Sequence, residues 1–195
     1  MSDLIQDHLS ENQYWMQQAI DLARRGQYST KPNPNVGCVI VKDGKIIGEG
    51  FHPKAGQPHA EVFALRQAGE NAKDATAYVT LEPCAHFGRT PPCAEALVKA
   101  QVKKVVVACS DPNPLVAGKG VKILQDAGIE VETGICDEEA KTLNFGFLKA
   151  MSTGLPYVRL KIASSLDGRT AMASGESKWI TGAIARQDVQ HWRAI

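Results

Sequence analysis

Residues 36–68 read VGCVIVKDGKIIGEGFHPKAGQPHAEVFALRQA, and this stretch decides the fold class. Asp43-Gly44 is typical of a two-residue hairpin turn, with an apolar run over residues 36–41 before it and a returning strand over residues 45–52 after it. A short helix is expected over residues 60–68, where apolar residues recur at helical spacing. The stretch therefore predicts a β-hairpin that leads directly into a helix.

Strands and helices are expected to alternate on either side of this stretch. The predicted elements are a helix over 11–25, strands over 77–81, 105–108 and 129–132, helices over 94–100 and 121–127, and a helix that Asp137 caps and that buries Leu143 and Phe147. A hairpin followed by strand–helix alternation indicates an α/β protein: a three-layer α/β/α domain with a mixed sheet.

The composition excludes several classes of protein. The chain has 195 residues, of which 44% are hydrophobic and 22% charged, so it is not disordered. Its net charge of +1 gives no sign of a nucleic-acid-binding surface. No run approaches the roughly 18 apolar residues of a membrane span, and Met1-Ser2-Asp3-Leu4 does not begin a secretory signal. We expect a soluble cytoplasmic protein with neither membrane nor nucleic acid as a partner.

The pattern restarts near the end of the chain. After Ser152-Thr153-Gly154, a new strand is expected over residues 157–163 and a helix over 183–194. These features predict one domain over residues 1–150 and a second unit over residues 151–195. A unit of 45 residues is close to the size below which a domain rarely stands alone, so we expect it to be the beginning of a larger domain.

Two of the five cysteines differ from the rest. Cys38, Cys109 and Cys136 lie among aliphatic residues and are expected to be small buried hydrophobes. Cys84 and Cys93 each follow a proline in a loop-like stretch. An odd number of cysteines without an export signal argues against a disulfide framework.

Cys84 and Cys93 combine with His59 into a candidate zinc site. One imidazole and two thiolates leave the fourth position open, as in catalytic zinc sites. Glu61, two residues after His59, suits general acid–base catalysis at such a site, provided that His59 lies at the mouth of its helix. Two alternatives stay open here: His86 as a fourth ligand of a closed structural site, or a disulfide between the two cysteines.

The pattern His-x-Glu, Pro-Cys and a second Cys resembles the signature of zinc-dependent nucleobase deaminases. The common form has two residues between the cysteines, whereas this chain has eight. TLEPCAHFGRTPPC (80–93) closely resembles the bifunctional riboflavin-biosynthesis deaminase/reductase family, and NPNVG (33–37) and DPNPLVAGKG (111–120) are similar to it too. The resemblance runs from about residue 12 to the end.

The resemblance implies a cytidine-deaminase-like fold and a substrate, 2,5-diamino-6-ribosylamino-4(3H)-pyrimidinone 5′-phosphate. Zn²⁺ would be held by His59, Cys84 and Cys93, and Glu61 would move protons during the release of ammonia. The product would be 5-amino-6-(5-phosphoribosylamino)uracil. The same match implies that the substrate is held by Asn33, His52, Arg89 and Asn113, of which His52 and Arg89 suit a phosphate.

The tail is similar to the start of the NADPH-dependent reductase of this family. LKIASSLDG (160–168) and GESKWIT (175–181) carry that likeness. It implies NADPH contacts at Ala163 and Trp179 and substrate contacts at Ser177 and Arg193, although Trp179 is equally suited to core packing. We expect this stretch not to bind NADPH productively by itself, and the sequence leaves homo-oligomerisation open.

Three functions remain at this point. The first is the pyrimidinone nucleotide deaminase, and the second is a zinc deaminase of another nucleobase or of nucleic acid. The balanced charge and 6% aromatic content count against nucleic acid. The third is a non-catalytic domain stabilised by zinc.

Overall fold

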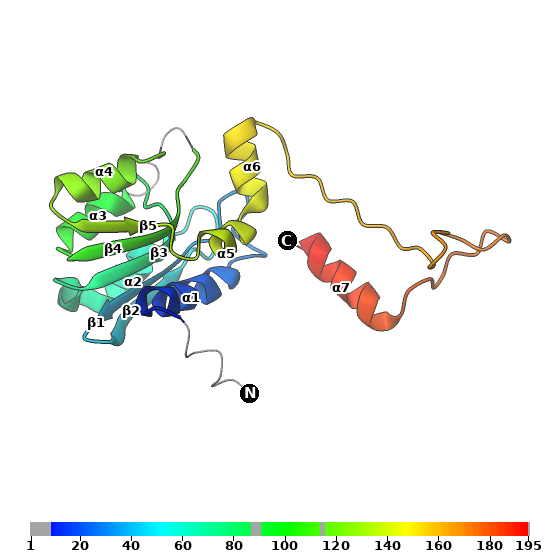
Figure 1. Cartoon of the computed structure of the whole chain (residues 1–195), viewed down its shortest axis with the longest axis horizontal. Helices are drawn as coiled ribbons and strands as arrows, with labels where there is room; N and C mark the ends of the chain where they lie inside the picture. The colour runs from blue at the N-terminus through cyan, green and yellow to red at the C-terminus, as the bar shows by residue number, and fades with distance from the viewer. Residues whose placement is uncertain (1–8, 87–90, 114–115, 195) are drawn as a thin grey trace. The chain divides into compact units, whose positions relative to one another are not determined.

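The computed structural model describes residues 9–86, 91–113 and 116–194 (Figure 1). The chain forms two compact units, Met1–Pro156 and Tyr157–Ile195, and each is described by itself. In the described part of the chain, no helix is long and apolar enough to cross a membrane.

The first unit is built on a five-stranded sheet of order β2-β1-β3-β4-β5. The strands are β1 (Gly37–Lys42), β2 (Lys45–Phe51), β3 (Thr76–Leu81), β4 (Lys104–Cys109) and β5 (Glu130–Thr133). β1 pairs with β2 and with β3 in antiparallel fashion, whereas β3, β4 and β5 are parallel. The predicted hairpin and mixed sheet are therefore confirmed.

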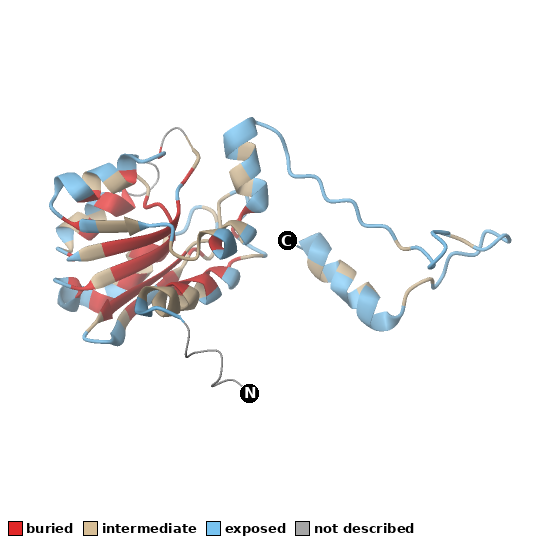
Figure 2. Ribbon diagram, in the orientation of Figure 1, coloured by how far each residue is buried: buried red, intermediate tan, exposed pale blue. Residues whose placement is uncertain are grey.

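Helices cover both faces of this sheet, and the two cores follow from strand alternation. Cys38 and Ile40 of β1 face a core shared with α2 (Ala60–Ala68), α3 (Cys93–Lys99) and α4 (Lys119–Asp126). Val39 and Val41 face the opposite core, shared with α1 (Glu11–Arg24) and α5 (Asp137–Thr142). Figure 2 shows β1, β3 and β4 as the most continuously buried strands of this unit. The predicted three-layer arrangement is confirmed.

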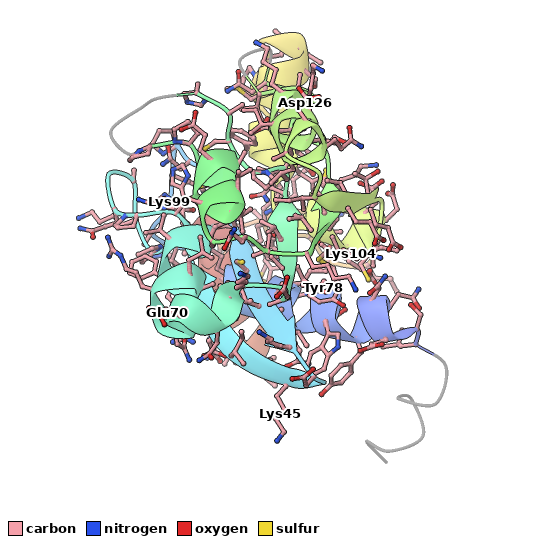
Figure 3. All side chains as sticks on the ribbon, turned by 90° about the vertical axis from the view of Figure 1, so that its left-hand side faces the viewer. Lys45, Glu70, Tyr78, Lys99, Lys104 and Asp126 are labelled. Atoms are coloured by element: carbon pink, nitrogen blue, oxygen red, sulfur yellow. The ribbon has the colours of Figure 1, made fainter. Side chains whose placement is uncertain are left out.

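A chain of polar contacts fastens α1 to the central strands. The Tyr78 hydroxyl donates to Asn12 Oδ1 at 2.9 Å, and Asn12 Nδ2 donates to Glu132 Oε2 at 2.8 Å. Lys104 lies on β4, the strand next to that of Tyr78 (Figure 3), and its Nζ is 2.8 Å from Glu132 Oε2. The network joins α1, β3, β4 and β5 and pairs the buried hydroxyl of Tyr78.

The prediction of one helix from Asp137 through Phe147 was wrong. The segment forms α5 and then α6 (Phe145–Thr153), separated at Leu143 and Asn144. Asn144 leaves helical geometry with φ −132°, and its side chain bonds to the distant Asn35. Asp137 is the first residue of α5, and the N-cap is Cys136, which has no side-chain capping bond.

The second unit contains α7 (Ala183–Ala194), as predicted, but the strand predicted over residues 157–163 was wrong. Val158, Leu160 and Ile162 are 77%, 82% and 63% exposed. A strand requires a paired neighbouring strand, and in the described part of the chain residues 157–163 are not part of the sheet.

Candidate active site

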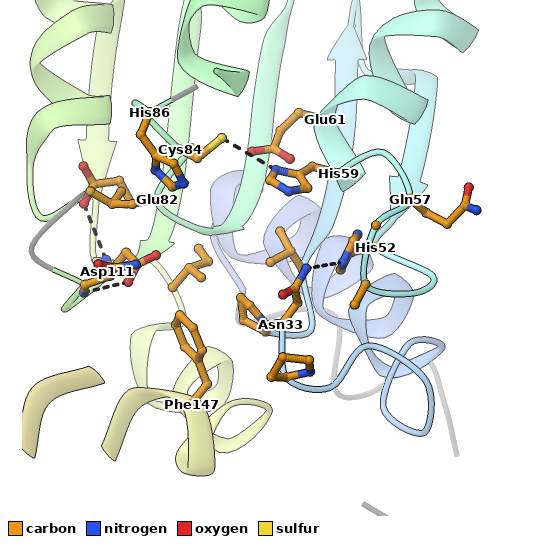
Figure 4. Close-up of a pocket in the computed structure, with 18 residues that line it drawn as sticks. Asn33, His52, Gln57, His59, Glu61, Glu82, Cys84, His86, Asp111 and Phe147 are labelled. Carbon is orange, nitrogen blue, oxygen red and sulfur yellow. Dashed lines mark hydrogen bonds between the residues drawn. The ribbon is translucent and has the colours of Figure 1, made fainter. Parts of the chain in front are cut away.

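Six of the eight site residues predicted for the first unit line a pocket of about 470 Å³. It lies where β3 and β4 end and where α2 and α3 begin, the usual location of a site in an α/β sheet. His59, Glu61 and Cys84 line its metal-binding side, and Asn33, His52 and Asn113 also line it. Figure 4 shows that all of these side chains except Asn113, which it does not label, lie around one space and come from separate elements.

The start of α2 brings His59 and Glu61 to the same side. His59 is the N-cap, with extended φ −76° and ψ 166°, and its carbonyl accepts from Val62 N–H at 3.1 Å. Glu61 lies in the first helical turn. His59 is therefore at the mouth of the helix, which is the condition that the sequence set for both side chains to approach one ion.

The two cysteines are joined across their loop by main-chain contacts. Cys93 is the first residue of α3, and its N–H lies 3.3 Å from Cys84 Sγ. The next N–H, from Ala94, donates to the Cys84 carbonyl at 3.2 Å. The start of α3 thus holds Cys84 beside Cys93, although eight residues separate them in sequence.

The spacing of the three donor atoms fits zinc. His59 Nδ1 lies 3.6 Å from Cys84 Sγ and 3.3 Å from Cys93 Sγ. Tetrahedral zinc bonds of about 2.0–2.3 Å separate nitrogen and sulfur ligands by about 3.5 Å. Among the described residues His86 is not part of this cluster, and both cysteines are free thiols, so neither the closed site nor the disulfide is supported.

The site perturbs the acidity of its own groups. A hydrogen bond from Cys93, chiefly, lowers the pKa of the Cys84 thiol to about 4, while its partner Cys93 has a raised pKa. Burial raises the pKa of Glu61 to about 7. Glu61 is 3% exposed, and its Oε2 is a buried atom without a hydrogen-bond partner. An unpaired buried carboxylate oxygen beside three candidate metal ligands indicates a group that hydrogen-bonds to a polar reactant when one is bound.

His52 and Asn33 form an ordered pair on another wall of the pocket. His52 Nδ1 lies 3.1 Å from the Pro58 carbonyl, which can only accept, so Nδ1 carries the proton. His52 Nε2 then accepts from Asn33 Nδ2 at 3.1 Å. This arrangement leaves the Asn33 amide oxygen and the second N–H of its Nδ2 as the groups that can face a ligand.

The other substrate residues predicted for this unit have different outcomes. Asn113 lines the pocket, and its N–H donates to Asp111 Oδ1 at 2.8 Å. Arg89 lies outside the described residues. His86, which the sequence offered only as a metal ligand, lines the pocket instead.

Phe147 and Glu82 are among the pocket residues to which the sequence gave no site role. Phe147 reaches the pocket from α6, which a reciprocal amide pair anchors: Asn35 N–H donates to Asn144 Oδ1 at 2.7 Å, and Asn144 Nδ2 donates to the Asn35 carbonyl at 2.9 Å. Glu82 lies in the quoted motif TLEPC, and the signal that could have found it is a charged residue directly after a buried strand.

The residues predicted for the reductase lie in the second unit. Ser177 and Trp179 line one shallow pocket there, whereas Ala163 and Arg193 do not line it. Trp179 is 70% exposed, and the Arg186 guanidinium lies 4.3 Å from the centre of its ring. Trp179 is therefore not a core residue within this unit.

Comparison with protein families gives two matches. Residues 9–109 match the cytidine and deoxycytidylate deaminase zinc-binding region, and residues 156–195 match the RibD C-terminal domain. Riboflavin biosynthesis protein RibD of Haemophilus influenzae is 66% identical over 185 residues, covering 95% of this chain and 50% of the relative.

Comparison with solved structures gives the same family. Acinetobacter baumannii RibD is 86% identical with a TM-score of 0.91, and the match covers 94% of this chain and 52% of that one. A diaminohydroxyphosphoribosylaminopyrimidine deaminase/5-amino-6-(5-phosphoribosylamino)uracil reductase from Thermotoga maritima is 45% identical with a TM-score of 0.88, covering 93% and 52%. The chain thus spans about half the length of the relatives it matches.

Proposed function

The chain belongs to the cytidine and deoxycytidylate deaminase zinc-binding family, and from this premise we propose that residues 1–150 are a hydrolytic deaminase of riboflavin biosynthesis. Its substrate is 2,5-diamino-6-ribosylamino-4(3H)-pyrimidinone 5′-phosphate, and its products are 5-amino-6-(5-phosphoribosylamino)uracil and ammonia. The likeness to RibD proteins supports this choice of substrate.

One observation carries the proposal. The unpartnered carboxylate oxygen of Glu61 lies beside a cluster of one imidazole and two thiols at zinc-ligand spacing, within a pocket. A closed structural site would need a fourth protein ligand and would give Glu61 no role. His59, Cys84 and Cys93 would hold the zinc ion, and the ion would supply the Lewis acidity that makes water nucleophilic near neutral pH.

Glu61 carries the protons of this reaction. Its pKa of about 7 lets the carboxylate accept a proton from water and later release it at the same pH. Oε2 takes the proton as the water oxygen bonds to the ring carbon that bears the 2-amino group. The same oxygen passes this proton to the adjacent ring nitrogen, then takes the second proton from the new hydroxyl group and delivers it to the departing amine, so that water and the amidine become a carbonyl and ammonia.

The substrate is held by amide groups on opposite walls. His52 is 3% exposed with a pKa lowered by burial, and both its ring nitrogens are occupied, which supports a neutral ring that orients Asn33 rather than a cation that binds phosphate. Asn33 would accept a hydrogen bond from a substrate N–H or O–H, and Asn113 would act from the far wall. The phosphate is assigned to Arg89 from the sequence alone.

Residues 151–195 are proposed to be the beginning of an NADPH-dependent reductase domain. The family match over residues 156–195 supports this assignment. Ala163 and Trp179 would contact NADPH, and Ser177 and Arg193 would contact the reductase substrate.

The test is ammonia release by the zinc-loaded chain from the pyrimidinone nucleotide, with cytidine, deoxycytidylate and guanine as competitors of equal concentration. The proposal expects turnover of the pyrimidinone nucleotide alone, with one zinc ion per chain. Turnover of cytidine without the pyrimidinone nucleotide would reject the substrate assignment.

A further inference from the structure

Glu82 occupies the point where the two central parallel strands end. It directly follows β3, and its N–H donates to the Cys109 carbonyl at the end of β4 at 2.9 Å. Its side chain is buried, at 4% exposure, and Cys84 follows two residues later. A buried carboxylate must be compensated by hydrogen bonds or by cations.

The compensation comes from main-chain N–H groups. Glu82 Oε2 accepts from Asp111 at 3.4 Å and from Gly118 at 3.0 Å. Glu82 Oε1 accepts from Gly120 at 3.1 Å and from Val121 at 3.3 Å. Among the described residues no lysine or arginine forms an ion pair with Glu82. Gly120 and Val121 lie in the first turn of α4, where the positive end of the helix dipole stabilises a carboxylate.

These four donors lie at both ends of the connection between β4 and α4. In its described parts, residues 111–113 and 116–121, the connection presents Asp111, Asn113 and Val116 to the pocket. Asn113 is tied to Asp111 by the bond already described, and its carbonyl accepts from Val116 N–H at 2.8 Å. Glu82 therefore binds both ends of a connection from which Asp111, Asn113 and Val116 line the pocket.

The same junction fixes this loop against the metal-binding segment. A Cβ added at Gly120 would lie 1.9 Å from the Pro83 carbonyl oxygen, so the start of α4 presses directly on the residue between Glu82 and Cys84. Any movement of the loop away from Glu82 would change the separation of Asn113 from Cys84. Figure 4 shows Glu82 and Asp111 on the wall that also carries Cys84.

We propose that Glu82 is a positioning residue that sets the place of Asn113 relative to the metal ligands. This inference rests on the proposed deaminase function, in which Asn113 contacts the substrate. Glu82 acts through the loop, and its oxygens are already engaged by the four N–H groups. A carboxylate is required because four donors need two oxygens, whereas a glutamine would place its own NH₂ against two of them.

The test is a double-mutant cycle on the zinc-loaded chain with E82Q, N113A and the double variant. E82Q is expected to raise KM about tenfold per zinc-loaded molecule and to change kcat less than threefold. It should add nothing to the KM of N113A, because its effect passes through Asn113. The exposed Glu95 provides the matched control E95Q, which should leave KM unchanged. Additive effects of E82Q and N113A on KM would overturn the proposal.

A second readout does not depend on catalysis. Amide hydrogen exchange at residues 116–121 should accelerate at least tenfold in E82Q and not in E95Q. If E82Q does not fold, E82D replaces it in the same cycle, because aspartate keeps the charge and shortens the side chain by one methylene. E82D should raise KM less than E82Q, and it should not raise KM further in the N113A background. If a folded Glu82 variant exchanges these amides at the wild-type rate, the inference is overturned. If exchange accelerates in the variant but the wild type does not turn over the nucleotide, only the deaminase assignment is rejected.

Discussion

Gly50 controls how closely the helix that carries the site approaches the sheet. It lies in β2, and a Cβ added there would meet the Ala60 carbonyl oxygen at 2.4 Å and Phe63 Cβ at 2.7 Å. Ordinary contact begins at 3.4 Å, so the G50A variant must separate β2 from the start of α2 by about 1 Å. That helical turn begins at His59 and contains Glu61.

Two effects follow from this displacement. Overpacking at a buried contact costs about 1–3 kcal/mol of folding free energy. A shift of about 1 Å in a catalytic group costs on the order of 10²-fold in rate. We therefore expect G50A to fold with reduced stability and to lose on the order of 10²-fold in kcat for ammonia release.

The assay combines urea unfolding with ammonia release normalised to bound zinc. Gly182 has no atom within 4 Å of an added Cβ, so G182A is the matched control and should resemble the wild type in both measurements. Wild-type kcat and wild-type stability in G50A would refute the claim that Gly50 sets the position of α2.

Three further predictions concern the hydrophobic core, the ionisation of Tyr78 and the metal site. L97A empties a fully buried side chain and should lower the free energy of unfolding by about 2–5 kcal/mol in urea titration. Burial raises the pKa of Tyr78 to about 12, so its neutral form contributes stability that is lost between about pH 10 and 12; Y78F should flatten that loss, whereas Y28F, at an exposed tyrosine, should not. C84A should abolish stoichiometric zinc binding measured by metal analysis, whereas C38A, at a buried cysteine outside the cluster, should keep it.

The sequence predicted those parts of the fold that depend on local signals. The Asp43-Gly44 turn and the alternation of apolar strands with amphipathic helices were sufficient for the mixed sheet. The break at Asn144 was missed because its cause is Asn35, 109 residues away in sequence. The strand predicted over residues 157–163 failed for the same reason, since an apolar pattern is local but the pairing that makes a strand is not.

The site residues also divide into those with a local sequence signal and those whose role depends on distant partners. His59, Glu61, Cys84 and Cys93 were predicted because metal chemistry prescribes residue types and spacings. Glu82 was not assigned a role, because its partners are main-chain N–H groups that any sequence would supply. The partnership of His52 with Asn33 depends on which nitrogen faces Pro58, and only the folded structure determines this.

If Glu61 moves protons beside a zinc ion, its loss must stop turnover without releasing the metal. Ammonia release from the pyrimidinone nucleotide and zinc content are measured together on the wild type, E61Q and the control E70Q, which alters an exposed glutamate. We expect one zinc ion per chain in all three proteins, with ammonia release reduced at least 10²-fold in E61Q alone. Wild-type ammonia release by zinc-loaded E61Q would contradict this role of Glu61.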